Sequence, residues 1–277
     1  MAQDASITID TNAAVRAVLA DERFVVPAAA ADDVVGTISW LRAHVSRFVN
    51  GDVHAARRAR VQLELDRIDP VALRAEAHRR AADVLAVGDV GSSVIEQAIP
   101  LAALAAALLP TGADVIAPLV PAVAAAYFPG VDDAAVRAGD GATAELVLRI
   151  GSNGDEMDTV VARIAVLVQS CTATAGLIHN AVAAALHSPP EATTDQLLAA
   201  VLRDDPPVPA LRRVADRDAE IDGVRVPAGT TVVCDVVRAN RTGGDHLTFG
   251  AGLRPCPGQA QALALAGGVV DAVRAVT

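Results

Sequence analysis

The sequence contains no lysine, so all 23 of its basic residues are arginines. Aromatic residues are also scarce, with one Trp, one Tyr and four Phe among 277 residues. A core of this composition is packed mainly from small aliphatic side chains, so an internal cavity has few aromatic walls. Positive charge is in deficit as well. The net charge of −10 argues against nucleic-acid binding, because phosphate contacts need a concentrated basic surface.

Cysteines and targeting signals are few. Three Cys in unrelated contexts do not match the disulfide framework of a secreted protein. The first twelve residues have neither a basic start nor an apolar run, so no signal peptide is predicted. The most apolar stretch begins at Ala98 and is interrupted by Pro100, Pro118 and Pro121, whereas a membrane-spanning helix needs about 20 uninterrupted apolar residues. We therefore expect a soluble, cytoplasmic protein with no membrane segment.

Hydrophobic periodicity predicts one mainly α domain over residues 1–277, with a small β insert. Arg- and Ala-rich helices are expected over residues 34–87, and apolar helices broken by Pro and Gly follow as far as Gly151. Residues 155–186 predict one long helix that is almost uncharged after Arg163, and therefore buried along most of its length.

After this helix the hydrophobic pattern changes from helical spacing to the alternation of a β-strand. A shorter helix is expected over residues 194–202, and β-branched residues alternate after it around an Asp222-Gly223 turn. This pattern predicts a β-hairpin over residues 220–233. A glycine-rich loop and a last helix complete the expected fold.

The loop sequence FGAGLRPCPG, from Phe249 to Gly258, carries the clearest chemical signal. A thiolate that binds iron must be held by backbone that approaches it closely and donates hydrogen bonds to the sulfur. Gly250, Gly252 and Gly258 allow this approach because they have no Cβ. The N–H groups after the proline can reach the sulfur of Cys256, whereas the proline itself has no N–H.

An ordinary structural role is the alternative for a cysteine in a glycine loop. Free Cys is commonly buried and inert, and we expect this of Cys171 and Cys234. For Cys256 the spacing of Phe, Gly, Arg and Gly around it favours a metal ligand, with Arg254 available to offset a carboxylate. Zinc is disfavoured, because no second Cys or His lies at ligand spacing nearby.

This loop resembles the haem-binding signature of the cytochrome P-450 family, in which the Cys is the proximal ligand of the iron. The resemblance implies a shortened cytochrome P-450-like fold, mainly α, with Cys256 binding the iron of haem b (heme b, iron protoporphyrin IX). It also implies that the rest of the loop, from Phe249 to Gly258, lies against the haem.

Other segments resemble the family in the same order along the chain. Residues 49–61 resemble helix C, where His54 and Arg58 lie four residues apart on one helical face and can both point at a haem propionate. Residues 203–208 resemble the end of helix K. The strand region that follows makes Arg213 a second partner for the propionates.

The proximal side departs from the family pattern. The Glu that normally precedes the helix K Arg by three residues is Ala200, although Arg203 is present. A loop that follows the Asn-Arg segment in the family, and supplies another Arg, is missing after Arg241. A buried charge without its partner is costly, so losing both features together is self-consistent. We expect Arg203 to face solvent or Asp204 and Asp205.

The distal side departs as well. Residues 155–186 resemble helix I, whose oxygen-activating segment reads Ala-Gly-x-acid-Thr in the family. Here Thr172 occupies the acid position and Ala173 the Thr position. Thr172 and Thr174 are the candidate catalytic hydroxyls for proton delivery. Each is rotated by about 100° from Ala173 on the helix, and the alternative is that both bond back to the helix backbone.

The resemblance implies a haem-thiolate oxidoreductase, most simply a monooxygenase that acts on a small apolar metabolite with electrons from a ferredoxin-type partner. Arg57, Arg58 and Arg60 form either a basic patch for that partner or a plain solvated helix face. Two alternatives stay open: peroxide-driven oxidation, dehydration or isomerisation, and a non-catalytic haem binder. The family's last β-hairpin is missing, so the substrate pocket is expected to be open or closed by a second copy or a partner subunit.

Overall fold

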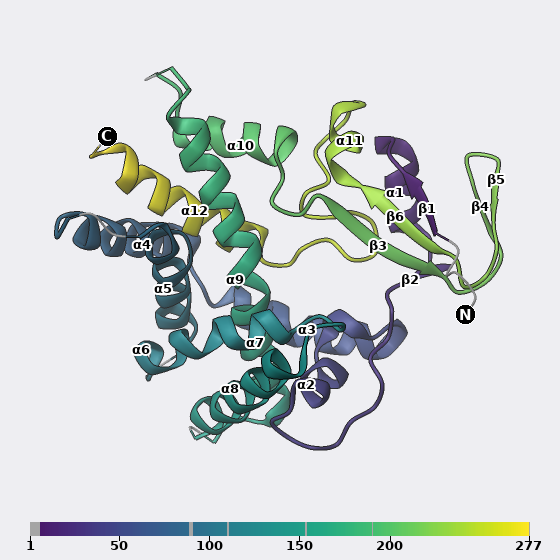
Figure 1. Ribbon diagram of the computed structural model, residues 1–277, viewed down its shortest axis with the longest axis horizontal. Coiled ribbons are helices and arrows are strands. Elements are labelled where there is room, and N and C mark those ends of the chain that lie inside the picture. Colours follow the sequence, from purple (N-terminus) through teal and green to yellow (C-terminus); the bar gives the residue numbers. More distant parts are fainter. Residues whose placement is uncertain (1–5, 89–90, 110, 153, 190, 277) are drawn as a thin grey trace.

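The computed structural model describes residues 6–88, 91–109, 111–152, 154–189 and 191–276. Helices form one part of the molecule, and a four-stranded sheet with two short helices and a hairpin forms the other (Figure 1). The helices of the first part are α2 (Ile38–His44), α3 (Gly51–Asp66), α4 (Pro70–Leu85), α5 (Ile99–Leu108), α6 (Ala113–Ile116), α7 (Val120–Ala126), α8 (Asp133–Gly151), α9 (Met157–Ala185), α10 (Thr194–Asp204) and α12 (Gln259–Arg274), with shorter turns η1 (Ser46–Phe48), η2 (Val94–Ala98) and η3 (Ala117–Leu119).

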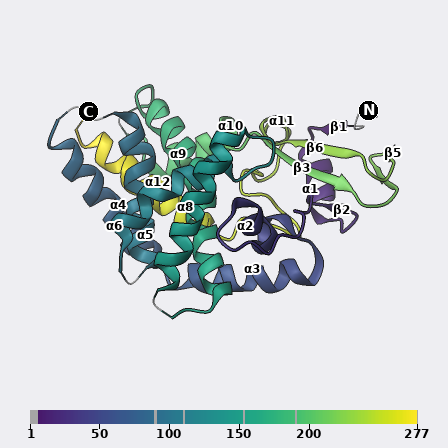
Figure 2. The ribbon, with the colours of Figure 1, turned by 60° about the horizontal axis from the view of Figure 1, so that its bottom comes forward.

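The long apolar helix α9 is the centre of the helical part. It packs against α3, α5, α7, α8, α10 and α12, and α12 lies between α4 and α9 (Figure 2). This confirms the buried helix predicted from the sequence. Among the described residues it is the one helix long and apolar enough to cross a membrane, and 67% of its most apolar window is buried against the rest of the protein, as in a core helix.

Capping residues explain where several helices begin. Thr193 and Gln196 form a reciprocal capping box at the start of α10, and Asp69 caps α4 with Pro70 in the first turn. Pro100 and Pro121 also lie in the first turns of α5 and α7, where a missing N–H costs nothing. These prolines lie within two short apolar helical segments, Val94–Leu108 and Ala113–Ala126, near the points where η2 passes into α5 and η3 into α7.

A buried ion network fixes α3 against α9. The guanidinium of Arg163 donates to Glu64 at 2.7 Å and to Asp155 at 2.6 Å, and the side chains of Arg163 and Glu64 are each 6% exposed. Removing one member would leave a buried charge without its counterion. The network therefore sets the position of α3, which carries two candidate site residues.

The sheet joins distant parts of the chain in the order β1-β6-β3-β2. Its strands are β1 (Ser6–Ile9), β2 (Phe24–Val25), β3 (Ala210–Ala215) and β6 (Thr231–Asp235), and the associated helices are α1 (Asn12–Ala20) and α11 (Val236–Arg241). β1 pairs in parallel with β6, and β3 pairs antiparallel with both β6 and β2. The parallel pair was not predicted, because its two strands lie at opposite ends of the sequence.

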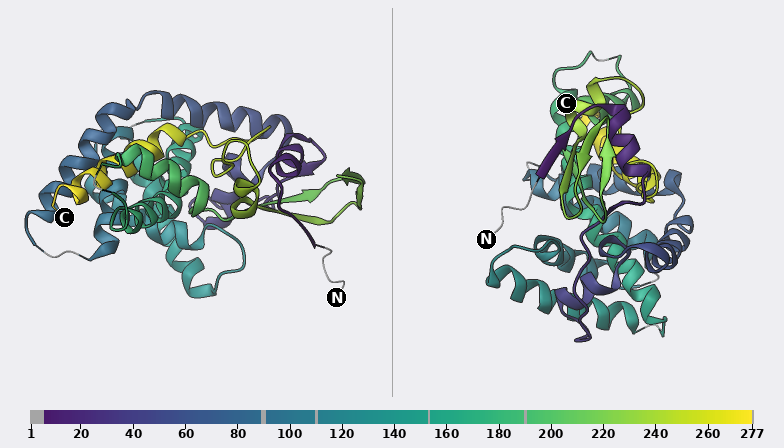
Figure 3. Two further views of the ribbon diagram at one scale, coloured as in Figure 1. Left: turned by 90° about the horizontal axis from the view of Figure 1, so that it is seen from above. Right: turned by 90° about the vertical axis from the view of Figure 1, so that its right-hand side faces the viewer.

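The predicted hairpin is present but shorter than expected. β4 (Ala219–Ile221) and β5 (Val224–Val226) pair around Asp222 and Gly223, both of which have positive φ, and the hairpin extends away from the body (Figure 3). The strand that follows it, β6, joins the larger sheet instead. The β-branched alternation after Gly229 therefore belongs to a second β element, which local sequence does not separate from the first.

Candidate functional site

The site is built on the loop between α11 and α12, which runs from the sheet to the helical part (Figure 1). The buried amide of Asn240 holds its start. Its Nδ2 donates to the carbonyl of Leu202 at 3.0 Å, and its Oδ1 accepts from the N–H of Leu247 at 2.7 Å. The hydroxyl of Thr248 donates to the same Leu202 carbonyl. The loop is thus tied to the end of α10.

Two glycines with positive φ shape the loop. Gly250 has φ 72°, and its N–H donates to Leu247 O at 2.8 Å. Gly252 has φ 64°, and a Cβ there would lie 2.2 Å from the carbonyl oxygen of Leu19 at the end of α1. The next N–H, of Leu253, donates to that oxygen at 3.0 Å. Close packing on α1, rather than approach to a metal, is the structural reason for glycine at position 252.

Cys256 differs from the other two cysteines. Cys171 and Cys234 are buried, whereas Cys256 is exposed. Its N–H donates to Phe249 O at 2.7 Å, which closes the loop, and its sulfur accepts a hydrogen bond from the N–H of Gly258. The Gly258 bond is the one predicted from the position of the proline. A sulfur held this way has a backbone donor whose position is fixed by the loop.

The pKa of the Cys256 thiol reflects two opposed effects. Desolvation by the surrounding protein raises it above the ordinary value, whereas the Gly258 N–H and the nearby Arg58 guanidinium lower it. Arg58 also donates to the carbonyl of Pro255, the residue before the cysteine. The cation on α3 and the cysteine loop are therefore in direct contact.

A cluster of basic side chains lies beside the loop. We call it the cation cluster, and its members come from four elements of the fold: Arg47 on η1, His54 and Arg58 on α3, Arg213 on β3, and Arg254 in the loop. The charged groups that shift the pKa values of His54 and Arg254 are neighbouring arginines, and each of them lowers the pKa. The structure thus brings together the four basic residues predicted from the sequence.

The basic groups of this cluster lower one another's pKa values. Desolvation, followed by Arg254, Arg58 and Arg213, lowers the pKa of His54 to about 4. Desolvation and three neighbouring arginines lower the pKa of Arg254 to about 10. Arg213, 6% exposed, has its pKa lowered by burial and by Arg47. Arg213 is buried and the other members are half-buried, and such a concentration of basic groups is stabilised by anions that enter it.

Arg47 is the member that sequence reasoning missed. Its guanidinium lies 5.6 Å from the ring centroid of Phe48 and 5.7 Å from that of Phe128, in cation–π contacts. Nothing in the local sequence distinguishes it from the other arginines. Arg254 also has a second role, because it donates to Asn50 Oδ1 and to the carbonyls of Ser46 and Val49, which ties the loop to the start of α3.

The donor set can be compared with the needs of a metal cofactor. Among the residues that the structure describes, no group of three or more His, Cys, Asp or Glu side chains is placed to hold a metal ion. A metal bound to Cys256 must therefore take its other ligands from a non-protein group. An iron porphyrin fits, since it supplies four nitrogens and its two propionates match the cation cluster.

The candidate catalytic hydroxyls on α9 do not share a face. Thr172 is exposed, next to exposed Gln169, whereas Thr174 is buried at 4% exposure. Asp158 is the one carboxylate in the sequence of α9, and it lies about 21 Å along the helix from Thr172. The helix therefore offers one exposed hydroxyl and no nearby acid of its own. The catalytic role of both threonines stays a prediction.

The predicted basic patch on α3 is only partly exposed. Arg57 donates to the carbonyls of Ala43 at 2.6 Å and Val45 at 3.3 Å, and Arg60 pairs with Glu156 at 3.4 Å. Arg57 and Arg60 line a crevice of about 150 Å³ beside α9. All three arginines thus make contacts within the protein, since Arg58 donates to the carbonyl of Pro255.

Comparisons with known proteins bear on the architecture. No protein-family model and no curated protein sequence matches the chain. Solved structures do match. The cytochrome P-450 RauA, complexed with a biosynthetic intermediate of aurachin RE, is 16% identical with a TM-score of 0.78, over 98% of this chain and 84% of that chain. The chain has the cytochrome P-450 fold.

Two further cytochrome P-450 structures agree. TxtC, described as catalysing sequential aliphatic and aromatic thaxtomin hydroxylation, is 20% identical with a TM-score of 0.71, over 98% of this chain and 84% of that one. P-450 BioI, in complex with an acyl carrier protein carrying hexadec-9Z-enoic acid, is 16% identical with a TM-score of 0.72, over 96% and 84%. The mainly α, shortened cytochrome P-450-like fold predicted from the sequence is confirmed.

Within that fold the helix K position is altered as the sequence indicated. Arg203 is exposed near the end of α10, and it forms no ion pair with any residue in the described part of the chain. Ala200, one turn before it, supplies no carboxylate. The cytochrome P-450 fold here therefore forms without that ion pair, and the loop is held by Asn240 and Thr248 instead.

Proposed function

We propose that this chain is a divergent, shortened member of the cytochrome P-450 family, one haem-thiolate domain over residues 1–277 that oxidises a small apolar metabolite. The observation that carries the proposal is the cation cluster beside an exposed cysteine whose sulfur accepts a backbone hydrogen bond. An isolated structural cysteine needs neither feature. A haem-thiolate site uses both, because a cysteine thiolate binds the iron and nearby cations stabilise the propionates.

The residues of the chain have separate roles in this proposal. Cys256 binds the iron, and the N–H of Gly258 stabilises the negative charge on the sulfur. His54, Arg58 and Arg213 bind the propionates, and Arg254 also orders the loop. When bound, the haem supplies an iron centre made electron-rich by the thiolate, which favours O–O cleavage. Thr172 is the exposed hydroxyl on α9 that can hold a proton near substrate.

One observation favours a second candidate function. α9 has no carboxylate near Thr172, and Ala173 replaces the family's threonine, so proton delivery to dioxygen lacks its usual groups. Peroxide-driven oxidation, dehydration or isomerisation needs no such delivery. We place hydroxylation first because the chain has both the cysteine loop and the basic residues that we propose bind the propionates. A non-catalytic haem binder is third.

The test of the proposal is an absorption spectrum of the purified, haem-loaded protein, reduced and exposed to carbon monoxide. We expect a thiolate-type band, and Cys256→Ser should abolish it. Cys171→Ala, which alters a buried cysteine on α9, should preserve the band. A protein that stays colourless with added hemin would contradict the proposal, as would a band that survives Cys256→Ser. Turnover with NADPH and a ferredoxin chain favours the first function, and turnover with peroxide alone favours the second.

The partners follow from the same proposal. A monooxygenase needs a small apolar substrate and an electron donor, which we propose is a ferredoxin-type protein in the cytoplasm. A second copy of the chain, or another subunit, is the further partner that we propose. Light scattering checks this: a mass equal to that of one chain would argue against a homodimer.

A further inference from the structure

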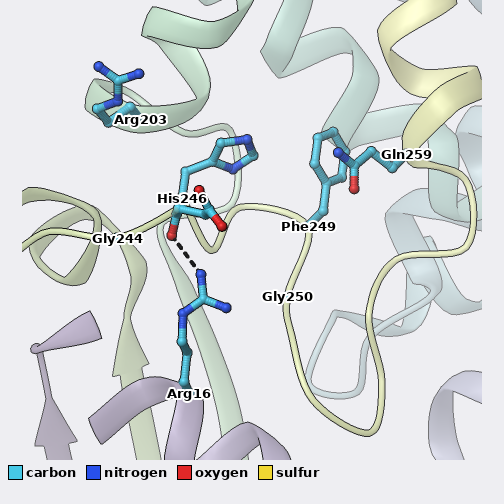
Figure 4. Close-up of a pocket in the computed structure, with 8 residues that line it drawn as sticks. Arg16, Arg203, Gly244, His246, Phe249, Gly250 and Gln259 are labelled. Carbon is cyan, nitrogen blue, oxygen red and sulfur yellow. Dashed lines mark hydrogen bonds between the residues drawn. The ribbon is translucent and has the colours of Figure 1, made fainter. Parts of the chain in front are cut away.

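A second cavity lies beside the cysteine loop, and none of the residues that line it belongs to the cation cluster. It has a volume of about 500 Å³ and lies between α1, α10, the loop and the first residue of α12 (Figure 4). Its charged and polar lining consists of Arg16, Arg203, Asp245, His246 and Gln259. Phe249 forms an apolar wall. The proposed haem function uses none of the polar groups in this cavity.

Two arginines that line the cavity have side-chain N–H groups without acceptors among the described residues. Arg203 forms no hydrogen bond or ion pair with the described residues. Arg16 uses its Nε for Asn12 Oδ1 at 2.7 Å and its Nη2 for the carbonyl of Asp245 at 2.9 Å, and its Nη1 has no acceptor in the part of the chain that is described. The lining holds a single carboxylate, that of Asp245, so positive charge is in excess.

The imidazole of His246 adds a ring nitrogen that can hydrogen-bond a ligand in the cavity. It lies between Arg203 and Phe249 (Figure 4), with its ring centroid 6.0 Å from that of Phe249. Its Nδ1 is buried and has no hydrogen-bond partner among the described residues. The other ring nitrogen, Nε2, also has no hydrogen-bond partner among the described residues and is not buried, so it is the nitrogen that a ligand in the cavity can reach.

We propose that this cavity binds a small organic anion, whose carboxylate or phosphate group contacts Arg203 and His246 while its apolar part lies against Phe249. Guanidinium and imidazole N–H groups are the donors that such oxyanions prefer. A bare phosphate would fill little of the volume, whereas ligand cavities of about 300–1,000 Å³ suit organic molecules. The proposal does not depend on haem binding, because none of these polar groups belongs to the cation cluster.

Isothermal titration calorimetry on the full, haem-loaded chain at low ionic strength tests the proposal. The probes are benzoate, phenyl phosphate and, as a neutral match, benzyl alcohol. We expect at least one anion to bind and benzyl alcohol not to. Arg203→Gln should weaken binding about tenfold or more, because a charge-assisted hydrogen bond is lost. Arg137→Gln, an exposed arginine on α8 outside the cavity, should leave the affinity unchanged.

Nuclear magnetic resonance of His246 supplies a second readout. Desolvation and Arg203 lower the pKa of this imidazole, and Arg16 lowers it too, whereas Asp245 raises it. A bound anion adds negative charge, so the pKa should rise when the ligand is present. Binding by benzoate alone or by phenyl phosphate alone assigns the preferred acid group.

Three results would overturn the proposal: neither anion binds, Arg203→Gln binds as tightly as the unaltered chain, or the His246 signals do not move. Benzoate that instead enters the substrate side of the haem would shift the haem absorption band and would be indifferent to Arg203→Gln. That pattern would also count against this cavity, while leaving the haem proposal intact.

Discussion

At the scale of single residues, His54 shows how the fold places charge. It is a neutral imidazole among arginines, because desolvation and Arg254, Arg58 and Arg213 all disfavour its protonated form. Without those surroundings the residue would titrate near 6.5, and in the folded chain its pKa is about 4. An anion bound beside His54 would favour its protonated form and raise its pKa.

A pH dependence of stability follows from this shift. The folded pKa lies below the unfolded one, so the unfolded chain takes up the proton first as the pH falls. Stability present above pH 6.5 is therefore lost progressively toward pH 4. We expect His54→Gln to flatten this loss in the haem-free protein, as measured by urea unfolding at pH 7 and pH 5. His187→Gln, an exposed histidine just after α9, is the control and should keep the slope of the unaltered chain.

At the scale of elements, the contact between the cysteine loop and α1 decides the loop's course. Gly252 combines φ 64° with a backbone carbonyl where its Cβ would be. Gly223, in the β4–β5 turn, has φ 79° but open space around the position of a Cβ. Comparing Gly223 with Gly252 therefore separates the free-energy cost of positive φ from that of close packing.

Alanine at each position measures both costs. Gly223→Ala should destabilise the protein by about 1–2 kcal/mol, the price of positive φ alone. Gly252→Ala should cost at least about 2 kcal/mol, because the clash with Leu19 O adds an overpacking penalty. Urea unfolding midpoints check the order. Equal losses in the two variants would mean that α1 moves away freely and does not position the loop.

At the scale of the whole molecule, the cation cluster joins the two parts of the fold. Arg47, His54 and Arg58 belong to the helical part, and Arg213 belongs to the sheet. Without an anion these groups repel one another across the boundary between the parts. A molecule with two carboxylates placed between them would convert that repulsion into attraction.

Hemin should therefore stabilise the entire chain. At a free hemin concentration 100 times the Kd, binding adds about 2.7 kcal/mol, which appears as a higher Tm. Arg213→Gln should reduce this gain, whereas Arg212→Gln, its exposed neighbour on β3, should not. Differential scanning calorimetry with and without hemin makes the measurement. The same gain in both variants would remove Arg213 from the propionate contacts.

Much of this could be predicted from residues close together in the sequence. The apolar run in α9, the Asp222-Gly223 turn and the spacing around Cys256 are local patterns, and each produced the element expected of it. The family resemblance then placed His54 and Arg213 in one cluster, which neither position shows by itself. The missing helix K carboxylate was also evident, since Ala200 stands where it would be.

The sequence by itself determined the helices, the β4–β5 turn and the position of the cysteine loop, because periodicity, turn residues and motif spacing act over short stretches of chain. Only the tertiary structure decided that Arg47 joins the cation cluster, that Gly252 is required by Leu19, and that His246 has a buried nitrogen without a partner. Each of these depends on elements that are distant in sequence and meet in the folded molecule. A local sequence pattern does not specify which distant surfaces will pack together. The contacts and the charge repulsion between those surfaces are therefore seen only in the folded structure.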